Sequence, residues 1–118
     1  MTARREANAR ARSVDELIAL LDSPFLRVLT EPARLELLKV LLRQGPADVG
    51  AIAAHLPQDR SVISRHLKAL SQVGVVRARS EGRHRIYEVD GQAFLASFEG
   101  LLSRLRALAP VCCPPASD

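Results

Sequence analysis

The 118-residue sequence has few aromatic residues and no long apolar run. It contains no tryptophan, and aromatic residues make up only 3% of the chain, although hydrophobic residues account for 47%. We therefore expect one compact domain whose core is built from Leu, Val, Ile and Ala. No apolar stretch is long enough to cross a bilayer, and the Arg-rich N-terminus is not followed by the apolar segment of a secretory signal. These absences predict a cytoplasmic protein without a membrane partner.

Cysteine is also scarce, and its two residues, Cys112 and Cys113, are neighbours. In a reducing compartment we expect no structural disulfide. A bond within the pair would also be strained, because adjacent Cα atoms lie about 3.8 Å apart and ordinary disulfides span about 4.4–6.8 Å. The chain has no Gly-rich phosphate-binding loop, and its thiols, histidines and acids form no recognisable set of nucleophile and base. An enzyme is therefore not expected.

Positive charge is concentrated in one part of the chain. The formal net charge is +4, but residues 60–85 carry seven basic residues and one acid, a net +6, and residues 1–12 carry a net +3. The rest of the chain is therefore acidic. A basic segment on an acidic body indicates a polyanionic partner. The alternative is a charged surface that is only solvated and has no partner. This alternative is disfavoured because the charges coincide with the motif described below.

The two ends of the chain differ from the middle. Residues 1–12 show no apolar periodicity, so we expect a mobile basic arm. Ser13-Val-Asp-Glu then matches a capping box, which predicts that the first helix begins at Ser13. Pro110 is expected to end the last helix and to open a tail, residues 110–118, that holds the cysteines. The sequence thus predicts one folded domain over residues 13–109.

Within that domain, capping and turn residues separate four helices from a hairpin and a last helix. Thr30 is the expected N-cap of the second helix, and Asp48 and Asp59 are expected to cap the third and fourth. The predicted buried stripe of the second helix comprises Leu35, Leu38, Leu41 and Leu42. Gly82 supplies the positive φ that a tight hairpin turn needs. The predicted order α-α-α-α-β-β-α is mainly α with a small β-hairpin, which is typical of a winged helix-turn-helix.

The fourth helix, roughly residues 60–72, has two different faces. Ile63, Leu67 and Leu70 recur at the spacing of one buried helical face. The opposite face carries short polar and cationic side chains, which a recognition helix presents to DNA. The candidate DNA-binding residues of this helix are Arg60, Ser61, Ser64, Arg65, His66 and Lys68.

These side chains suit different contacts with DNA. Arg65 can make a bidentate contact with a guanine edge, and the two serines allow a close approach to bases or phosphates. Arg60, Lys68 and His66 suit contacts with phosphates.

The hairpin that follows adds four further candidate DNA-binding arginines. Arg83 and Arg85 flank its tip, where a wing lies beside the DNA backbone or the minor groove. Arg77 and Arg79 alternate along one strand, and the sequence leaves open whether they are wing contacts or solvated charges. Tyr87 is expected to pack between the wing and the core.

The chain resembles the ArsR/SmtB family of winged-helix transcriptional repressors between about Phe25 and Val89. The matching segments are Leu29-Thr-Glu-Pro-Ala-Arg-Leu-Glu-Leu-Leu, Ile52-Ala-Ala-His-Leu, Ser61-Val-Ile-Ser-Arg-His-Leu-Lys-Ala-Leu, Gly74-Val-Val and Glu81-Gly-Arg-His-Arg-Ile-Tyr. The resemblance implies a homodimer formed by the first and last helices, with two recognition helices on a palindromic double-stranded DNA operator. The many apolar residues of the last helix agree with such an interface.

The resemblance also directs attention to the effector. Many family members carry cysteines at the start of the recognition helix, and others bind zinc on the last helix. This chain has no cysteine at the start of the predicted recognition helix. On its last helix, Asp90 and Glu99 without a histidine do not make a zinc site. Some arsenite-responsive relatives carry an adjacent cysteine pair at the end of the last helix and a third cysteine soon after, which is missing here.

Soft thiolates suit trivalent arsenic and antimony. The sequence therefore predicts a repressor that needs no cofactor and leaves its operator when As(III), Sb(III) or another thiophilic ion binds Cys112 and Cys113. A third ligand would come from the partner protomer, a small thiol or solvent.

Three alternatives remain open at the level of sequence. The pair could form an intermolecular disulfide in a redox-sensing repressor, or it could have no role in a repressor without a metal effector. A winged helix can also serve as a protein-binding module, which would bind DNA weakly and without sequence preference.

Overall fold

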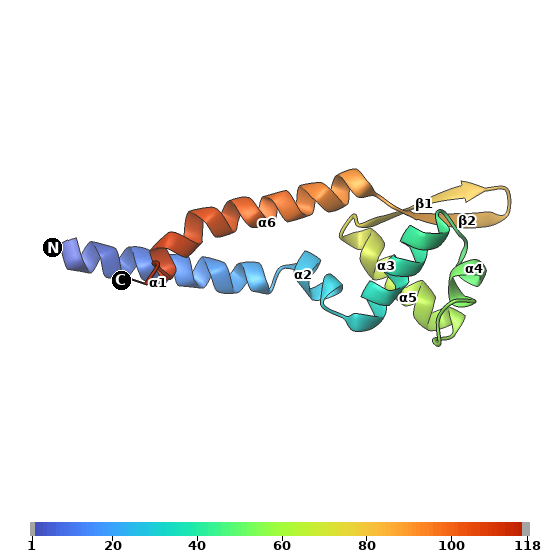
Figure 1. Ribbon diagram of the computed structural model, residues 1–118, viewed down its shortest axis with the longest axis horizontal. Coiled ribbons are helices and arrows are strands. Elements are labelled where there is room, and N and C mark those ends of the chain that lie inside the picture. The colour runs from blue at the N-terminus through green and yellow to red at the C-terminus, as the bar shows by residue number, and fades with distance from the viewer. Residues whose placement is uncertain (1, 117–118) are drawn as a thin grey trace. The chain divides into compact units, whose positions relative to one another are not determined.

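The computed structural model describes residues 2–116, and over this range it contains six helices and two strands (Figure 1). They are α1 (Thr2–Leu21), α2 (Pro24–Leu29), α3 (Pro32–Gln44), α4 (Val49–Ala53), α5 (Arg60–Gln72), β1 (Val76–Glu81), β2 (His84–Val89) and α6 (Gly91–Cys112). The fold is a mainly helical winged helix-turn-helix with a β-hairpin wing, as predicted. The short α2 adds one helix to the predicted order.

The chain divides into two compact units. One is Pro24–Leu95, and the other contains the residues up to 23 together with those from 96 onward. No helix in the described range is long and apolar enough to cross a membrane.

The core of the Pro24–Leu95 unit is aliphatic. Six of its residues have no exposed surface. Val75 directly precedes β1, and the other five come from α3, α4 and α5: Leu37, Ile52, Ile63, Leu67 and Leu70. The rings of Phe25 and Phe94 meet edge to face at the margin of this core, with centroids 6.4 Å apart. The recognition helix α5 therefore buries the face that its spacing predicted.

The buried face of α3 differs from the prediction. Leu35 is 41% exposed and Leu42 is 66% exposed, while Leu37, Leu38, Val40 and Leu41 are buried. Six of the eight residues from 35 to 42 are apolar, so periodicity alone is compatible with more than one face. Packing against α5 and the wing decides which leucines turn inward.

Aspartates at three helix starts satisfy backbone amides. Asp48, Asp59 and Asp90 each accept a hydrogen bond from the backbone N–H three residues on, at 2.8, 3.1 and 3.1 Å. These bonds cap α4, α5 and α6 and confirm the caps predicted at Asp48 and Asp59. The start and direction of the recognition helix are thus set by a local bond at Asp59.

Thr30 does not cap α3, contrary to the prediction. Its hydroxyl donates to the carbonyl of Arg27 at 3.3 Å, because Thr30 closes the preceding helix α2. Glu31 occupies the cap position of α3 without a side-chain cap bond. Pro32 follows at the first helical position, where its missing N–H leaves one amide fewer to satisfy.

The helices at both ends of the chain extend beyond the predicted bounds of the folded domain, residues 13–109. Residues 2–12 are helical, because α1 begins at Thr2 rather than at Ser13, which lies inside the helix and is 8% exposed. Ala, Arg and Glu, which dominate residues 3–12, are good helix formers, and a helix needs no apolar periodicity when such residues follow one another. Residue 1 of the predicted arm lies outside the described range.

The last helix also runs further than predicted. α6 continues through Pro110 to Cys112. Pro110 lacks an N–H, but the amide of Cys113 still donates to the carbonyl of Ala109 at 2.8 Å and holds the last turn. Cys112 therefore belongs to a helix and not to a tail. Residues 117 and 118 of the predicted tail lie outside the described range.

The wing is a two-stranded antiparallel hairpin. Its register pairs Val76 with Val89 and Glu81 with His84, and Gly82 at the turn has φ +62°, as predicted. Tyr87 exchanges backbone hydrogen bonds with Ala47 at 2.8 and 3.0 Å, and its side chain packs against the core. The base of the wing is thus fixed to the segment that precedes α4.

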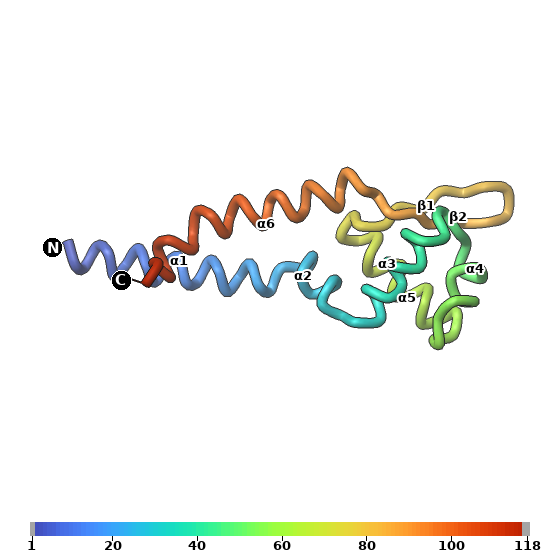
Figure 2. Tube along the Cα trace, viewed as in Figure 1, coloured from blue at the N-terminus to red at the C-terminus, as the bar shows by residue number. Residues whose placement is uncertain are grey.

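In the other unit, α1 runs beside the C-terminal half of α6 (Figure 2). Leu20, Leu108 and Cys112 are buried in this unit. Many large apolar side chains of the two helices remain exposed: Ile18, Leu21, Leu95, Phe98, Leu102, Leu105 and Val111. An exposed apolar surface of this extent is typical of an interface.

Candidate functional site

The recognition helix presents its predicted polar face to solvent. Of the ten candidate DNA-binding residues, nine are exposed, and His66 is half-buried. The hydroxyl of Ser61 donates to Asp59 at 2.7 Å. This bond, followed by the bond from the amide of Val62, lowers the pKa of Asp59. Ser61 is thus held by the cap, while Ser64 lies one turn further along the exposed face.

His66 is positioned by a neighbouring helix. Arg34 in α3 donates from Nε to Nδ1 of His66 at 3.3 Å and from Nη1 to the carbonyl of Val28 at 3.4 Å. Burial, and after it the positive charge of Arg34, lower the pKa of His66. Since Nδ1 accepts, the neutral ring carries its proton on Nε2 and offers one donor to a ligand. No local pattern in the sequence indicates this contact, because the two residues belong to different helices.

The remaining cations of α5 are not held in ion pairs within the described chain. Arg60, Arg65 and Lys68 form no ion pair with any residue between 2 and 116. The guanidinium of Arg60 reaches back toward α4, where a Cβ added at Gly50 would lie 3.0 Å from one of its nitrogens. Because Gly50 has no side chain, it leaves room for the guanidinium of Arg60.

In the wing, two of the four candidate arginines are paired with acids. Arg77 donates to Glu88 at 3.0 Å, and Arg79 approaches Glu81 at 2.8 Å and Glu88 at 3.7 Å. Arg77 and Glu88 are direct partners in the strand register, so counting back from the turn at Gly82 would have revealed the pair. This pairing favours the reading of Arg77 and Arg79 as surface ion pairs.

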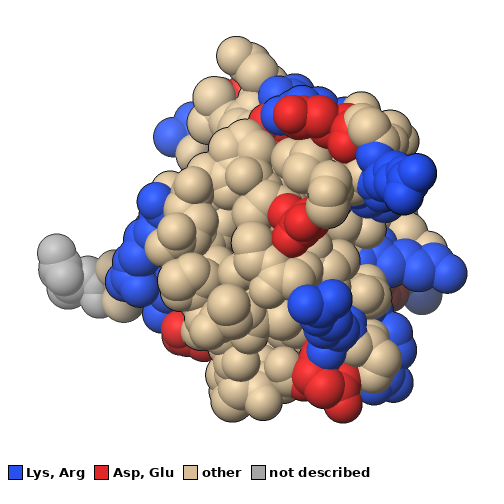
Figure 3. Space-filling model, turned by 90° about the vertical axis from the view of Figure 1, so that its right-hand side faces the viewer, with Lys and Arg blue, Asp and Glu red and all other residues tan. Residues whose placement is uncertain are grey.

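The two arginines nearer the tip differ from this pair. Arg83 forms no ion pair with a described residue, and Arg85 lies over the ring of Tyr87 at 5.9 Å. On the face drawn in Figure 3, Lys and Arg lie mostly toward the margin, with acids beside several of them and uncharged side chains in the centre. Positive charge on this face is therefore partly balanced.

Asp48 joins the wing to the start of the helix-turn-helix. Its Oδ2 lies 3.2 Å from Nδ1 of His84, the first residue of β2, while Oδ1 caps α4. One carboxylate thus contacts two elements that both flank the recognition helix. The sequence predicts only the capping role, because nothing local connects residues 48 and 84.

The cysteine pair lies in and just after the last turn of α6. Cys112 is 2% exposed and Cys113 is exposed, and both are free thiols. Their sulfur atoms are 2.6 Å apart. The contact with Cys113, and after it burial, raise the pKa of Cys112. Arg10 in α1 donates from Nε to the carbonyl of Cys112 at 3.1 Å and so binds the two helices together.

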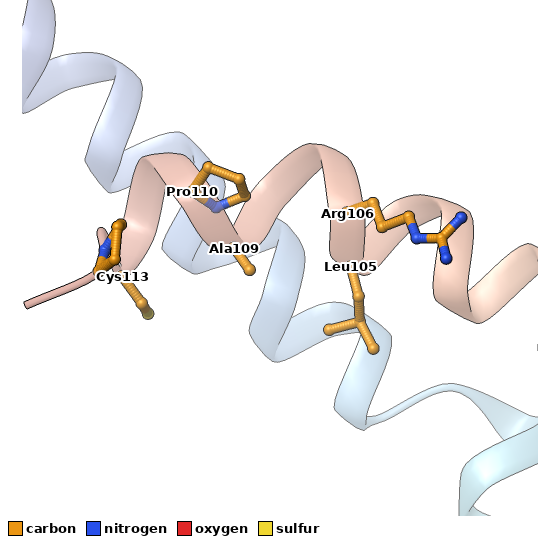
Figure 4. A pocket seen from close by; sticks show the side chains of 6 residues that line it. Leu105, Arg106, Ala109, Pro110 and Cys113 are labelled. Carbon is orange, nitrogen blue, oxygen red and sulfur yellow. The ribbon is translucent and has the colours of Figure 1, made fainter.

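A surface pocket adjoins the exposed thiol (Figure 4). It is lined by Leu105, Arg106, Ala109, Pro110, Cys113 and Pro115. The side chains of Leu105, Ala109 and Cys113 point to the same side of α6, while Arg106 extends away from them (Figure 4). No group of three or more His, Cys, Asp or Glu side chains that could hold a metal ion occurs among the described residues.

Comparison with known proteins gives the family. A family model described as bacterial regulatory protein, arsR family, matches residues 31–78, from the start of α3 into β1. A solved structure described as a possible transcriptional regulator for arsenical resistance is 40% identical, covers 70% of this chain and 92% of that chain, and superposes with a TM-score of 0.56. The chain belongs to the ArsR family. This ArsR-family protein is therefore a DNA-binding transcriptional regulator and not an enzyme.

Other relatives of this ArsR-family chain differ in what they are described to do. The regulator CmtR of Mycobacterium bovis is 43% identical over 61 residues, which are 52% of this chain and 51% of CmtR. The antimony-specific repressor AntR is 26% identical, with 80% of each chain covered and a TM-score of 0.53. A homodimeric winged helix-turn-helix domain from Mycobacterium bovis is 29% identical, with 77% of this chain and 84% of that chain covered and a TM-score of 0.57.

The matches to curated relatives of this ArsR-family chain are partial. The matched parts span 66%, 46% and 51% of the length of the first three relatives. The residues that the family model matches include α4 and α5, and the family assignment therefore concerns the DNA-binding portion above all.

Proposed function

We propose that this chain is a homodimeric repressor that binds a palindromic DNA operator and leaves it when trivalent arsenic or antimony binds Cys112 and Cys113. The observation that carries the DNA-binding part is the two-faced recognition helix. Its apolar face is fully buried, and its opposite face presents Arg60, Arg65 and Lys68, which form no ion pair with a described acid.

The proposed DNA contacts divide into two kinds. Arg65, at the centre of the exposed face of α5, reads a base edge, and such a contact is worth about 1–3 kcal/mol of discrimination. Arg60 and Lys68 bind phosphates and add affinity without sequence preference. In the wing, Arg83 and Arg85 approach the backbone or the minor groove.

The proposed dimer uses the exposed apolar side chains of α1 and α6. Leu95, Phe98 and Leu102 on α6 are 56%, 46% and 47% exposed. Their spacing of three and four residues is that of a seam between helices. Burial of such side chains is worth about 25 cal/mol for each Å² removed from water. The relative described as a homodimeric winged helix-turn-helix supports this assembly.

The proposed sensor rests on the chemistry of the thiols and on their position. Thiolates are the side chains that best suit soft ions, and two relatives are described in terms of arsenical resistance and antimony. A ligand at the last turn of α6 acts on the helix that carries the dimer seam. A coupling free energy of about 1–3 kcal/mol would weaken operator binding roughly 5- to 150-fold.

Oxidation of the pair is the second candidate. Cys113 is exposed, so an oxidant reaches its thiol, which can then form an intermolecular disulfide with the partner protomer. In that case diamide or peroxide, rather than arsenite, would release the operator.

The DNA-binding part is tested by fluorescence anisotropy with DNA from the protein's own promoter, at fixed salt and under reducing conditions. Arg65→Ala is expected to weaken binding about 5- to 150-fold and to relax sequence preference. Arg104→Ala, an exposed arginine on α6, removes the same charge and is expected to bind like the wild type. Equal affinities for the two variants would contradict the proposed reading surface.

The sensor is tested in the same assay by titration with arsenite and antimonite. The wild type is expected to release the operator, and a Cys112→Ser/Cys113→Ser variant is expected to bind DNA normally and to retain it. Full release from the serine variant would show that the pair is not the sensor.

A further inference from the structure

We propose that Arg34 is a positioning residue for DNA binding, which holds His66 of the recognition helix so that the ring offers its Nε2–H, as an uncharged donor, to a phosphate of the operator. The proposal rests on the DNA-binding function proposed above. It adds a residue of α3, a helix that supplies none of the candidate DNA contacts. It follows from the two hydrogen bonds of Arg34, from the free side of the His66 ring, and from the charges around that ring.

Arg34 connects three helices through its guanidinium. It lies in the first turn of α3 and donates from Nη1 to the carbonyl of Val28 at 3.4 Å and from Nε to Nδ1 of His66 at 3.3 Å. Val28 lies in the last turn of α2, where helix carbonyls lack a partner within the helix. The recognition helix α5 packs against both α2 and α3 (Figure 1). Because the donors of a guanidinium stand at fixed angles, the bond to Val28 restricts where the Nε–H meets His66.

His66 lies at the margin between the buried and the exposed face of α5. It is half-buried, and it stands between the exposed Arg65 and the buried Leu67. Because Nδ1 accepts from Arg34, the neutral ring carries its proton on Nε2. Within residues 2–116, the only hydrogen bond of this ring is the one to Arg34, and Nε2 is not among the buried polar atoms without a partner. The donor at Nε2 is therefore accessible to a ligand.

The surroundings of the ring keep this donor uncharged. Burial, and after it the positive charge of Arg34, lower the pKa of His66. Glu31 at the start of α3 acts in the opposite direction, and Arg65 adds a smaller effect in the same direction as Arg34. A proton on Nδ1 would also remove the acceptor that Arg34 uses and would bring two cations together. The ring thus contributes a directed hydrogen bond, whereas Arg65 and Lys68 contribute charge.

An uncharged donor and a cation have different effects on the salt dependence of binding. Each phosphate neutralised by Lys or Arg releases counterions, so the logarithm of the binding constant falls with the logarithm of the salt concentration, by about 0.9 per phosphate. A neutral histidine that donates to a phosphate oxygen adds no such release. Loss of the His66 contact should therefore weaken binding by the same factor at every salt concentration. Loss of the Lys68 contact should also reduce the slope by about one.

The first test measures the affinity of the full chain for DNA from its own promoter by fluorescence anisotropy, between about 50 and 200 mM salt. Arg34→Lys keeps the charge and loses the planar fork. We expect it to weaken binding about fivefold or more, with an unchanged salt slope. Arg43→Lys makes the same exchange at an exposed position of α3 and is expected to bind like the wild type.

Two substitutions of His66 separate the roles of its two nitrogen atoms. His66→Asn keeps an acceptor near the place of Nδ1 and loses the donor at Nε2, whereas His66→Gln brings an amide N–H near the place of Nε2. We expect His66→Asn to weaken binding about tenfold or more, and His66→Gln to weaken it by a smaller factor. In the His66→Asn background, Arg34→Lys should cause less than about twofold further loss, because Arg34 acts through the ring.

Nuclear magnetic resonance of the His66 ring gives a readout that a merely structural role of Arg34 would not change. Long-range ¹H–¹⁵N spectra distinguish the two neutral forms of a histidine ring, and the signals of His66 are those missing from the spectrum of His66→Gln. We expect the Nε2–H form in the wild type. Arg34→Met removes both the donor and the charge, so the ring should populate both neutral forms and the pKa of His66 should rise.

The outcomes separate this proposal from the function on which it rests. If Arg65→Ala weakens operator binding while Arg34→Lys and His66→Asn bind like the wild type, the positioning role is overturned and the DNA-binding function stands. The same conclusion follows if Arg34→Lys causes an equal loss with and without His66, or if the ring keeps the Nε2–H form in Arg34→Met. A salt slope reduced by about one in His66→Asn would show that the ring binds phosphate as a cation, and would overturn the proposal. If Arg65→Ala also binds like the wild type, the proposed reading surface itself is overturned.

Discussion

Arg34 in α3 donates a hydrogen bond from Nε to Nδ1 of His66 in the recognition helix, across 3.3 Å. The contact holds the His66 ring through Nδ1. This nitrogen must be unprotonated, because it accepts the hydrogen bond. Burial and the charge of Arg34 lower the pKa of His66, so the folded state holds this ring neutral.

This relationship predicts a pH dependence of stability. The pKa of His66 is lowered in the folded protein, so the unfolded chain binds a proton more readily. The contribution to the free energy of unfolding is complete above the unfolded pKa, about 6.5, and is lost progressively as the pH falls from there toward the folded pKa. Urea unfolding at pH 7.5 and 5.5 should show a smaller loss in His66→Gln than in the wild type.

The control for this prediction is His55→Gln, a substitution at an exposed position. It should keep the wild-type loss of stability between the two pH values. A His66→Gln variant with the same pH dependence as the wild type would show that His66 is not held neutral.

A second prediction separates the two roles of Asp48. The carboxylate caps α4 at 2.8 Å and lies 3.2 Å from His84. Asp48→Ala should lower the free energy of unfolding by about 0.5–2 kcal/mol, because a cap is lost. Asp48→Asn keeps an equally good capping oxygen and removes only the charge of an exposed contact with His84, which is worth little. Urea unfolding of both variants measures the difference, and equal losses would assign the effect to the contact with His84.

A third prediction concerns the core. Leu67 in α5 has no exposed surface, whereas Leu42 in α3 is 66% exposed. Leu67→Ala should lower the free energy of unfolding by about 2–5 kcal/mol, because it leaves a cavity. The same truncation at Leu42 should stay within about 0.5 kcal/mol of the wild type. A large loss at Leu42 would mean that α3 buries the face predicted from its leucine spacing.

A fourth prediction concerns the proposed dimer. Leu102 on α6 is 47% exposed, and burial in a dimer would make a charge there unfavourable. Leu102→Glu should shift the protein to monomers in sedimentation velocity and weaken operator binding. Leu42→Glu carries the same change at a more exposed leucine of α3 and should stay dimeric. A dimeric Leu102→Glu protein would place the interface elsewhere.

The elements that were predicted correctly depend on neighbours along the chain. The caps at Asp48 and Asp59, the buried face of α5 and the turn at Gly82 each follow from bonds or spacings within a few residues. Local hydrogen bonds, and the single apolar face indicated by the residue spacing of α5, make these features predictable without a structure. The helix-turn-helix and its wing were predicted for this reason.

Only the tertiary structure decided which side chains meet across elements. The inward face of α3, the pairing of Arg77 with Glu88, the contact of Arg34 with His66 and the bond from Arg10 to Cys112 all join separated parts of the chain. Helix phase in a leucine-rich segment, strand register and packing between helices set these contacts. Each is a property of the assembled chain, because the free energy of burial depends on the partner surface as well as on the local sequence.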